Sequence, residues 1–453
     1  MKSKVMEEKM KIKYKRLTLI LTVFLFLIFC FNTSYACTAF IIDDAEDYCL
    51  VRNLDIPDSY GYIMINKTNV TKTAFIPDDM SETPAVWTSK YGSVTFNQIS
   101  RDIPQGGMNT AGLVIEHLQL NNTQYEHVDS RQVVTTHNYN QYVLDNCATV
   151  AEVIDAFNTI RLTGFCVKAH YIIVDASGDY AIIEVLNGQL RIRSKADMGS
   201  YYKAISNSDF ISSINEANKY QIFGGTIPTL PAGPFYVGTG QSLSRFVLAA
   251  DAVRRNELYN PSDPINYGFT ELENITTGSG VRFVWDLNNR CFYYKTVYNT
   301  SIRQINIDDY DYSPGSDNMV IHADAAIEPG NWVEYSTALN TEMFDQLLAR
   351  VPALVTVYGF DDYKSQIVVY PESAIYPTDP TPTPEPSHCG DVNFDGNISI
   401  LDALLIAQFY VDLDPHPFYQ SAADVTGDGS INIIDALLIA QYYVELITSF
   451  PGC

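Results

Sequence analysis

Short apolar runs alternate with polar turns along most of the chain, and they predict a mixture of strands and helices. Residues 38–42 and 50–54 are apolar runs on either side of an acidic segment, residues 43–47, which is typical of a hairpin of two buried strands. Residues 170–174 and 180–185 flank Ser177 and Gly178 and predict a second hairpin. Residues 354–358 and 366–370 are also strand-like.

Helical spacing of apolar residues predicts helices in the middle of the chain. Thr149 and Glu152 have the spacing of a capping box, and the apolar stripe that follows extends to Ile160. A second helix is expected to begin at Ser244. Glycines at residues 106, 107 and 112 indicate a turn ahead of another strand, residues 113–116.

The first 36 residues have a composition of their own. Seven Lys or Arg residues precede an apolar core at residues 17–31, and the small residues Ser34 and Ala36 follow this core. This order is typical of a secretory signal peptide, residues 1–36, and we expect cleavage after Ala36. No other stretch approaches the ~20 apolar residues of a membrane span, so we expect a soluble mature chain.

Length and charge limit the classes of function. At 453 residues the chain is longer than one ordinary domain, so two or more units are expected. Removal of residues 1–36, with seven basic and two acidic residues, changes the formal net charge from −24 to −29. Such an acidic chain is not expected to bind nucleic acid or an anionic membrane.

A segment rich in proline and threonine, residues 376–388, is expected to be an extended linker. It would separate one module at residues 37–375 from a second at residues 389–453. Seven cysteines follow Ala36, and an odd number in a secreted chain indicates one free thiol, for which Cys37 is the candidate. Cys389 and Cys453 bracket the second module and are candidates for a disulfide. Four others lack metal-type spacing and are interpreted as buried or paired structural residues: Cys49, Cys147, Cys166 and Cys291.

Cleavage after Ala36 would make Cys37 the first residue of the mature chain. Its thiol and a free α-amine would then share one carbon atom, and an amine with a pKa near ~7.7–8.0 is partly unprotonated at neutral pH. The amine can therefore serve as the base for the thiol nucleophile. The alternative is a secreted chain that begins with cysteine by chance.

Arg52 and Asp55 would return toward Cys37 if the first predicted hairpin forms. A guanidinium near a thiol favours the thiolate, and a carboxylate can accept a hydrogen bond from the α-amine. The alternative for these two residues is a surface ion pair. His170 lies in a predicted core strand and is interpreted as structural.

Four motifs together resemble the choloylglycine hydrolase family, the linear amide C–N hydrolases: Cys37, Arg-Asn-Leu-Asp at residues 52–55, residues 89–98 and Gly-Met-Asn at residues 107–109. This family of N-terminal-nucleophile hydrolases includes bile salt hydrolases and penicillin V acylases. The resemblance spans residues 37–370. It implies an α+β fold with four αββα layers and hydrolysis of a linear, non-peptide amide without a catalytic cofactor.

The resemblance also implies a set of catalytic residues. Asn207 would donate its side-chain amide to the oxyanion, and Arg245 would be a second active-site arginine beside Cys37, Arg52 and Asp55. Gln119 stands where bile salt hydrolases have an asparagine. Because glutamine is longer, a backbone amide is an alternative oxyanion donor, and the acyl and amine parts of the substrate stay open.

Residues 391–412 and 424–445 repeat each other at a spacing of 33. Each has oxygen-bearing residues at loop positions 1, 3, 5, 9 and 12 and Gly at position 6, which is an EF-hand calcium pattern with Asp as its last ligand. Each loop leads into one apolar helix, residues 403–410 and 436–443. We expect two structural calcium ions, with position 7 contributing its main chain; the ligands are Asp391, Asn393, Asp395, Asn397, Ser399, Asp402, Asp424, Thr426, Asp428, Ser430, Asn432 and Asp435.

Two loop–helix units after a Pro/Thr linker resemble a type I dockerin, a small all-α calcium-binding domain. The resemblance implies a cohesin module of a scaffold protein as partner, as in cellulosomes, and an extracellular location. The cohesin-binding residues would be Ile400, Leu401, Ile433 and Ile434. The near-symmetry of the repeats implies two possible orientations of binding.

The sequence thus predicts a secreted, scaffold-attached amidase that acts on a small N-acyl amide. Three alternatives stay open. A cysteine directly after a signal sequence is also where lipid is attached, although Ser34 stands where such signals usually have leucine. The others are a catalytically silent, dockerin-bearing binding protein and an N-terminal-cysteine peptidase.

Overall fold

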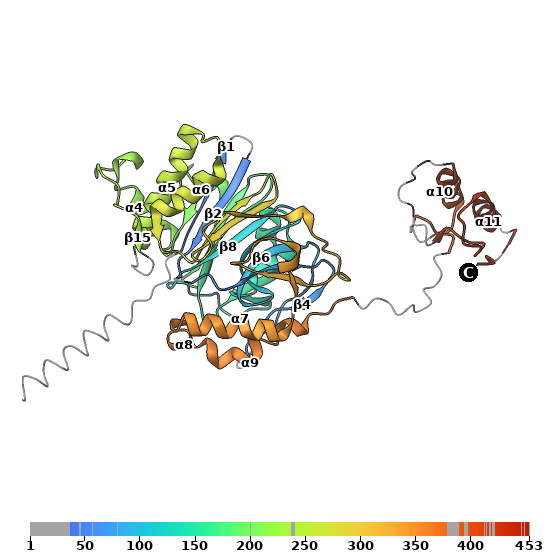
Figure 1. The fold of residues 1–453 in the computed structure, drawn as a ribbon, viewed down its shortest axis with the longest axis horizontal. Helices are drawn as coiled ribbons and strands as arrows, with labels where there is room; N and C mark the ends of the chain where they lie inside the picture. Colours follow the sequence, from blue (N-terminus) through green and yellow to red (C-terminus); the bar gives the residue numbers. More distant parts are fainter. Residues whose placement is uncertain are drawn as a thin grey trace, which may run out of the picture. The chain divides into compact units, whose positions relative to one another are not determined.

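The protein is described from a computed structural model of residues 37–453, without residues 45–46, 57, 79, 200, 237–240, 378–388, 394–396, 412, 414, 416–417, 419–421, 445, 448 and 453. The chain divides into two compact units, Met1–Pro377 and Thr378–Cys453 (Figure 1). The boundary lies in the segment rich in proline and threonine.

Two large antiparallel sheets form the centre of the described part of the first unit. The six-stranded sheet, in the order β14-β1-β2-β17-β18-β19, contains β1 (Thr38–Asp44), β2 (Asp47–Leu54), β14 (Ala204–Ile205), β17 (Val281–Asp286), β18 (Cys291–Thr296) and β19 (Arg303–Asn306). The nine-stranded sheet, in the order β13-β12-β11-β8-β7-β6-β3-β20-β21, contains β3 (Tyr62–Asn66), β6 (Ser93–Ser100), β7 (Ile103–Asn109), β8 (Val114–Gln119), β11 (Ala169–Val174), β12 (Tyr180–Leu186), β13 (Gln189–Ser194), β20 (Met319–His322) and β21 (Val333–Glu334). Smaller pairs are β4 (Thr71–Thr73) with β5 (Val86–Thr88), β9 (Gln132–Thr135) with β10 (Ile160–Thr163), and β15 (Phe235–Tyr236) with β16 (Thr276–Thr277).

Helices cover the outer faces of both sheets, which gives the predicted α+β fold with four αββα layers. α5 (Ser242–Tyr259) and α6 (Pro264–Ile275) pack against the six-stranded sheet, with α4 (Phe210–Ala217) beside α5 (Figure 1). α2 (Tyr139–Asn146), α3 (Val150–Ala156) and α7 (Thr337–Arg350) pack on the nine-stranded side. Short helical turns are α8 (Ala353–Thr356), α9 (Lys364–Ile367), η1 (Lys195–Asp197), η2 (Gln221–Phe223), η3 (Ile307–Asp309), η4 (Pro329–Asn331), η5 (Phe360–Tyr363) and η6 (Tyr370–Ser373).

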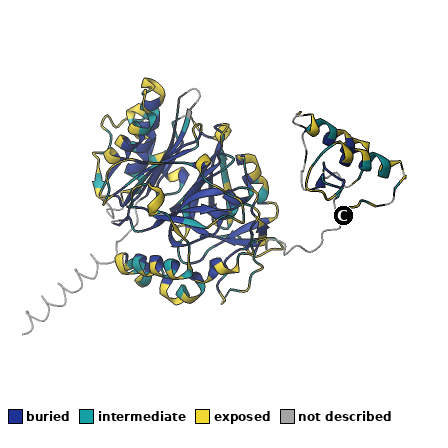
Figure 2. Cartoon of the chain, turned by 45° about the vertical axis from the view of Figure 1, so that its right-hand side comes forward, coloured by how far each residue is buried: buried dark blue, intermediate teal, exposed yellow. Residues whose placement is uncertain are grey.

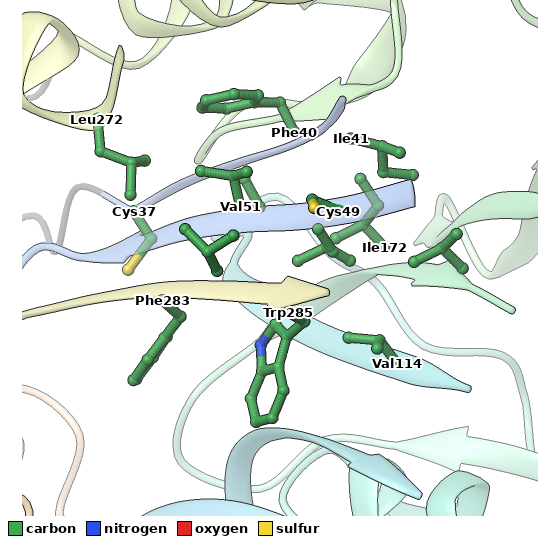
Figure 3. Close-up of a cluster of buried hydrophobic side chains, with 14 of the residues drawn as sticks. Cys37, Phe40, Ile41, Cys49, Val51, Val114, Ile172, Leu272, Phe283 and Trp285 are labelled. Carbon is green, nitrogen blue, oxygen red and sulfur yellow. The ribbon is translucent and has the colours of Figure 1, made fainter. Parts of the chain in front are cut away.

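The largest apolar core contains side chains from both sheets and from α5 and α6, so the central strands β1 and β2 of the six-stranded sheet are buried on both faces (Figure 2). This double burial explains why β1 and β2 each contain a continuous apolar run and not an alternating pattern. Trp285 stacks on Phe292 with ring centroids 3.9 Å apart. Figure 3 shows Cys37 at the edge of the same cluster as Phe283 and Trp285.

Both predicted hairpins are confirmed. β1 pairs with β2 in a register that places Thr38 opposite Asn53, and β11 pairs with β12 around Gly178, which has a φ of 74°. The helix predicted from Thr149 is also present, and the Thr149 side chain accepts from the Glu152 backbone N–H. It ends at Ala156, so Ile160, expected on its apolar stripe, instead begins β10.

Two other predictions need correction. The turn predicted before β8 lies at residues 110–112, where Gly112 has a φ of 83°, but Gly106 and Gly107 lie inside β7. Gly106 is needed there for space, because a Cβ would collide with the Glu116 carboxylate on the neighbouring strand. Residues 354–358 and 366–370 form helical turns and not strands. Leu354 and Ile367 pack with α7 into one apolar cluster, and an apolar run this short does not distinguish a strand from a helix.

The second unit contains α10 (Ile400–Tyr410) and α11 (Ile433–Tyr443), which pack against each other around Ile406 and Ile439. Both helices begin three residues before the predicted start. The reason is a capping box at each N-terminus, formed by Ser399 with Asp402 and by Asn432 with Asp435.

Cysteine use differs in part from the prediction. Cys389 is disulfide-bonded, and Cys453, its expected partner, lies outside the described residues. Cys147 and Cys291 are buried, which confirms one of the two alternatives predicted for them, but both are free thiols, so more thiols are free than the one, Cys37, that the odd count indicated. An odd number of cysteines means that not all of them can form disulfides, but it sets no upper limit on the number of free thiols. Within the described segments, no helix has both the length and the apolarity to cross a membrane.

Candidate active site

Cys37 lies directly before β1 and lines a cavity of the first unit, with 4% of its surface exposed. Antiparallel pairing of β1 with β2 places Arg52 opposite Ala39, so Arg52 returns to the thiol as the sequence predicted. Its guanidinium interacts with the Cys37 sulfur, and Nη1 donates to the Gln105 carbonyl oxygen at 2.8 Å. The predicted proximity of these two residues is therefore present.

Glu116 of β8 holds the other side of Arg52. Its carboxylate accepts from Arg52 Nη1 and, at 2.6 Å, from Trp285 Nε1. Burial raises the pKa of Glu116, while the Arg52 charge opposes that rise. Burial also disfavours the charged guanidinium, but Glu116 and Cys37 outweigh it and raise the pKa of Arg52. Arg52 therefore stays a cation beside the thiol.

Asp55 is fully buried just beyond the end of β2. Its backbone N–H donates to the Cys37 sulfur, and Ser279 Oγ donates to its Oδ1. Oδ2 has no hydrogen-bond partner among the described residues. Burial raises the pKa of the carboxyl to about 6, although Ser279 and Arg245 lower it. This buried oxygen is an acceptor available to a donor on Cys37.

The thiol itself is held in its neutral form. Burial raises the pKa of Cys37, and this effect exceeds the opposing pull of the Arg52 charge. A nucleophile at this position therefore needs a base that removes its proton as it attacks.

Asn207 and Arg245 meet on the other side of β1. β14 pairs with β1 so that Ile205 lies opposite Ala39, and continuing this register by two residues places Asn207 opposite Cys37. Asn207 Nδ2 donates to the Gln119 carbonyl oxygen at 2.9 Å, and its Oδ1 accepts from Arg245 Nη2 at 2.9 Å. The Asn207 amide thus keeps one hydrogen available next to the thiol.

Arg245 is 1% exposed, although its position in the first turn of α5 would suggest a surface charge. Its Nε donates to Thr38 Oγ1 at 3.2 Å. Burial lowers the pKa of Arg245, while Asp55 and Cys37 raise it. The structure therefore brings the six predicted catalytic residues into one neighbourhood, with Gln119 included through its contact with Asn207.

Gln119 ends β8 and lines the same cavity. Its Nε2 donates to Asn121 Oδ1 at 2.6 Å and to the Tyr358 hydroxyl. Since both N–H groups are engaged, the side chain could donate to an oxyanion only after one of these bonds breaks. The arrangement favours the alternative of a backbone donor.

Sequence reasoning missed several residues of this site. Glu116 and Ser279 contact the predicted residues directly, and two histidines, His117 and His137, line the cavity. The rest of the cavity wall is largely apolar. It includes four residues from the end of α7 and the turns that follow it: Leu347, Val351, Leu354 and Phe360. The sequence carried one signal for these residues, which is the position of Glu116 within an apolar strand. A buried carboxylate needs a charged or hydrogen-bonding partner, so Glu116 predicts one nearby.

The predicted calcium loops of the second unit carry oxygen donors only, which suits calcium. Thr426 Oγ1 lies 3.0 Å from both Asp424 Oδ1 and Asp435 Oδ1, so loop positions 1 and 12 approach each other. In the first loop Asp402 accepts from the Val392 N–H, while Asp395 lies outside the described residues. No group of three or more His, Cys, Asp or Glu side chains suited to a metal ion occurs in the parts of the chain that the structure describes.

Family models match both units. Residues 37–249 match the linear amide C-N hydrolases, choloylglycine hydrolase family, and residues 389–443 match the dockerin type I domain. A penicillin V acylase of Pectobacterium atrosepticum is 25% identical over 337 residues, which are 62% of this chain and 83% of that protein. The resemblance stated from the motifs is thereby confirmed for both units.

The fold of the first unit is similar to that of a solved acylase, and a second solved structure also matches the chain. Penicillin V acylase from Agrobacterium tumefaciens is similar with a TM-score of 0.54 and 23% identity, over 66% of this chain and 98% of that one. A variant of conjugated bile acid hydrolase from Clostridium perfringens has a TM-score of 0.49 and 18% identity, over 66% and 97% of the two chains.

Proposed function

We propose that Cys37 is the nucleophile of this chain once cleavage before it frees its α-amine. The proposal builds on the match of residues 37–249 to the choloylglycine hydrolase family of linear amide C–N hydrolases and of residues 389–443 to the dockerin type I domain. The observation that carries the proposal is that Cys37 and Arg52 line one cavity and contact each other, while the Asp55 backbone N–H donates to the same sulfur. The buried Asp55 Oδ2, which lacks a partner within the described chain, supplies the acceptor that an α-ammonium needs.

The first half of the reaction forms a thioester. The Cys37 sulfur attacks the amide carbonyl carbon while its α-amine takes the thiol proton, because burial keeps the thiol neutral beforehand. Arg52 stabilises the negative charge on sulfur before the bond forms. The α-ammonium then gives its proton to the departing nitrogen, the C–N bond breaks, and an amine leaves.

The second half consumes water. The α-amine takes a proton from a water molecule that attacks the thioester carbonyl. The C–S bond then breaks and the α-ammonium returns this proton to the sulfur, which releases a carboxylic acid and restores the thiol and the free amine. Asn207 and backbone N–H groups stabilise the oxyanion in both halves. Asp55 orients the amine throughout, and no step needs a metal ion.

A substrate panel tests this function. N-acyl amides and short peptides are compared for release of amine, using protein whose first residue is Cys37. We expect hydrolysis of N-acyl amides and a loss of about 10³-fold or more in Cys37→Ala. Cys147→Ala is the matched control, because this thiol is buried in a different cluster, and it retains hydrolysis. Peptide cleavage without amide cleavage would favour the peptidase.

The second unit attaches the enzyme to a cohesin module in an extracellular cellulosome-type complex, with two structural calcium ions. Four residues in the first turns of α10 and α11 support a cohesin-binding surface there, because each is apolar and 46–53% exposed: Ile400, Leu401, Ile433 and Ile434. Because both helices present such a pair, Ile400→Asp alone should leave binding through α11. Cohesin capture should be lost only when Ile433→Asp is added.

A further inference from the structure

The cavity beside Cys37 is apolar but contains polar atoms that the proposed mechanism does not use. His117 and His137 line it with the apolar wall from α7 and the turns after it. Arg52 is the one cationic side chain among the described residues that line it, and Glu116 holds that charge. A charged acyl group would therefore find no unpaired opposite charge there.

Asn140 fixes which nitrogen of His117 carries the proton. Asn140 Nδ2 donates to the carbonyl oxygens of Pro104 and Gln105, at 3.1 and 3.0 Å, and lies 2.8 Å from His117 Nδ1. The two carbonyls require the amide nitrogen, and not its oxygen, at this position. An amide nitrogen cannot accept, so Nδ1 carries no proton; the two carbonyl oxygens share one amide hydrogen and Nδ1 accepts the other, which places the proton of the neutral ring on Nε2.

The environment keeps both imidazoles neutral. Burial, assisted by the Arg52 charge, holds the pKa of His117 well below its ordinary value, and burial lowers the pKa of His137 to about 3. His117 Nε2 donates to none of the described residues. The His137 ring packs against Phe165 and Phe360, and its buried Nδ1 has no partner in the described chain.

From this arrangement we infer that His117 is a specificity-determining residue that donates Nε2–H to an oxygen atom within an otherwise apolar, uncharged acyl chain. The inference rests on the proposed function, because it assigns the acyl side of the substrate to the Cys37 cavity. A chain with an ether, keto or hydroxyl oxygen would satisfy this donor, whereas an all-methylene chain would leave it buried without an acceptor. His137 adds a second neutral polar atom to the same wall.

The test uses pairs of N-acyl amides with the same amine and chain length. In each pair one methylene is replaced by an ether oxygen, and the position of the oxygen moves along the chain from pair to pair. For the mature full chain we expect kcat/KM to favour the ether by about 10-fold or more at one position. His117→Phe should reduce this ratio to about one, while His117→Gln, which keeps an N–H donor, should preserve part of it.

His127→Phe is the matched control, because His127 is exposed and outside the cavity, and its ratio should equal that of the natural chain. Hydrolysis of both members of every pair without an ether preference would overturn the inference and leave the proposed function intact. An ether preference that survives in folded His117→Phe would overturn it as well. If His117→Phe fails to fold, the ether preference of the natural chain and its partial retention in His117→Gln still test the inference. If no amide is hydrolysed in a Cys37-dependent way, the proposed function fails, and the inference fails with it.

Discussion

Arg52 of β2 and Glu116 of β8 form a buried ion pair that joins the two sheets of the first unit, with side chains 1% and 0% exposed. The same guanidinium contacts Cys37. The pair therefore connects the two sheets behind the Cys37 thiol, and it also fixes a cation next to this proposed nucleophile.

Removing one partner of this ion pair should destabilise the fold more than removing both partners. Arg52→Met leaves the Glu116 carboxylate buried without its cation, which should lower the free energy of unfolding by about 3–5 kcal/mol. Adding Glu116→Gln removes the uncompensated charge, so the double variant should recover part of the loss. Urea unfolding of the four proteins measures the coupling, and strictly additive effects would contradict the role of the pair.

Gly106 should tolerate no side chain. A Cβ at this position would meet the Glu116 carboxylate, which cannot move without leaving Arg52. We expect Gly106→Ala to lower the free energy of unfolding by about 1–3 kcal/mol and to reduce amide hydrolysis. Gly315→Ala is the control, since a Cβ there meets nothing within 4 Å. Equal stability of the two variants would disprove the steric account.

Asp55 should make stability depend on pH in a chain whose Cys37 nitrogen is still in a peptide bond. Its pKa in the folded chain is about 6, above the ~3.9 of an unfolded aspartate, so the folded state binds the proton more tightly. This contribution is fully present below pH ~4 and is lost as the pH rises through 6.

Asp55→Asn removes the titration. The natural chain should therefore lose on the order of 3 kcal/mol relative to this variant between pH 4 and pH 7. Unfolding at several pH values measures the difference, and Asp361→Asn, at an exposed position, is the control. A difference that stays constant over this range would contradict the burial of the carboxyl.

Calcium removal should affect the second unit and spare the first. The loop carboxylates lie beside the capping boxes of α10 and α11, so a chelator should unfold these helices and abolish cohesin binding. Native mass spectrometry should show two ions on the untreated chain and one on Asp424→Ala. Amide hydrolysis should continue in the chelator, and its loss would show that calcium also serves the first unit.

Local sequence patterns were sufficient for the centre of the site. Cys37, Arg52 and Asp55 are close in sequence, and one hairpin brings them together, so its apolar runs predicted their proximity. Asn207 and Arg245 came only from family resemblance, since a loop asparagine and a helix-start arginine carry no local signal. Each of them contacts residues more than 35 positions away.

The remaining residues depend on contacts between distant strands. Glu116 and Ser279 lie 64 and 224 positions from the residues they contact, and strand alternation does not reveal which partner a buried polar side chain meets. Gly106 was misread as a turn residue because sequence does not distinguish a glycine needed for φ from one needed for space. His117 also escaped notice, since its role depends on a cavity wall formed partly by misassigned helical turns.

The most direct test of the central claim is the intact mass of the protein recovered outside its host cells, measured before and after it is mixed with an activated N-acyl amide and rapidly quenched. The account predicts a chain that begins with unmodified Cys37 and then carries one acyl group, which peptide mapping locates on Cys37 as a thioester. A diacylglyceryl group on Cys37, a first residue elsewhere that blocks its amine, or an acyl group on another residue would contradict it.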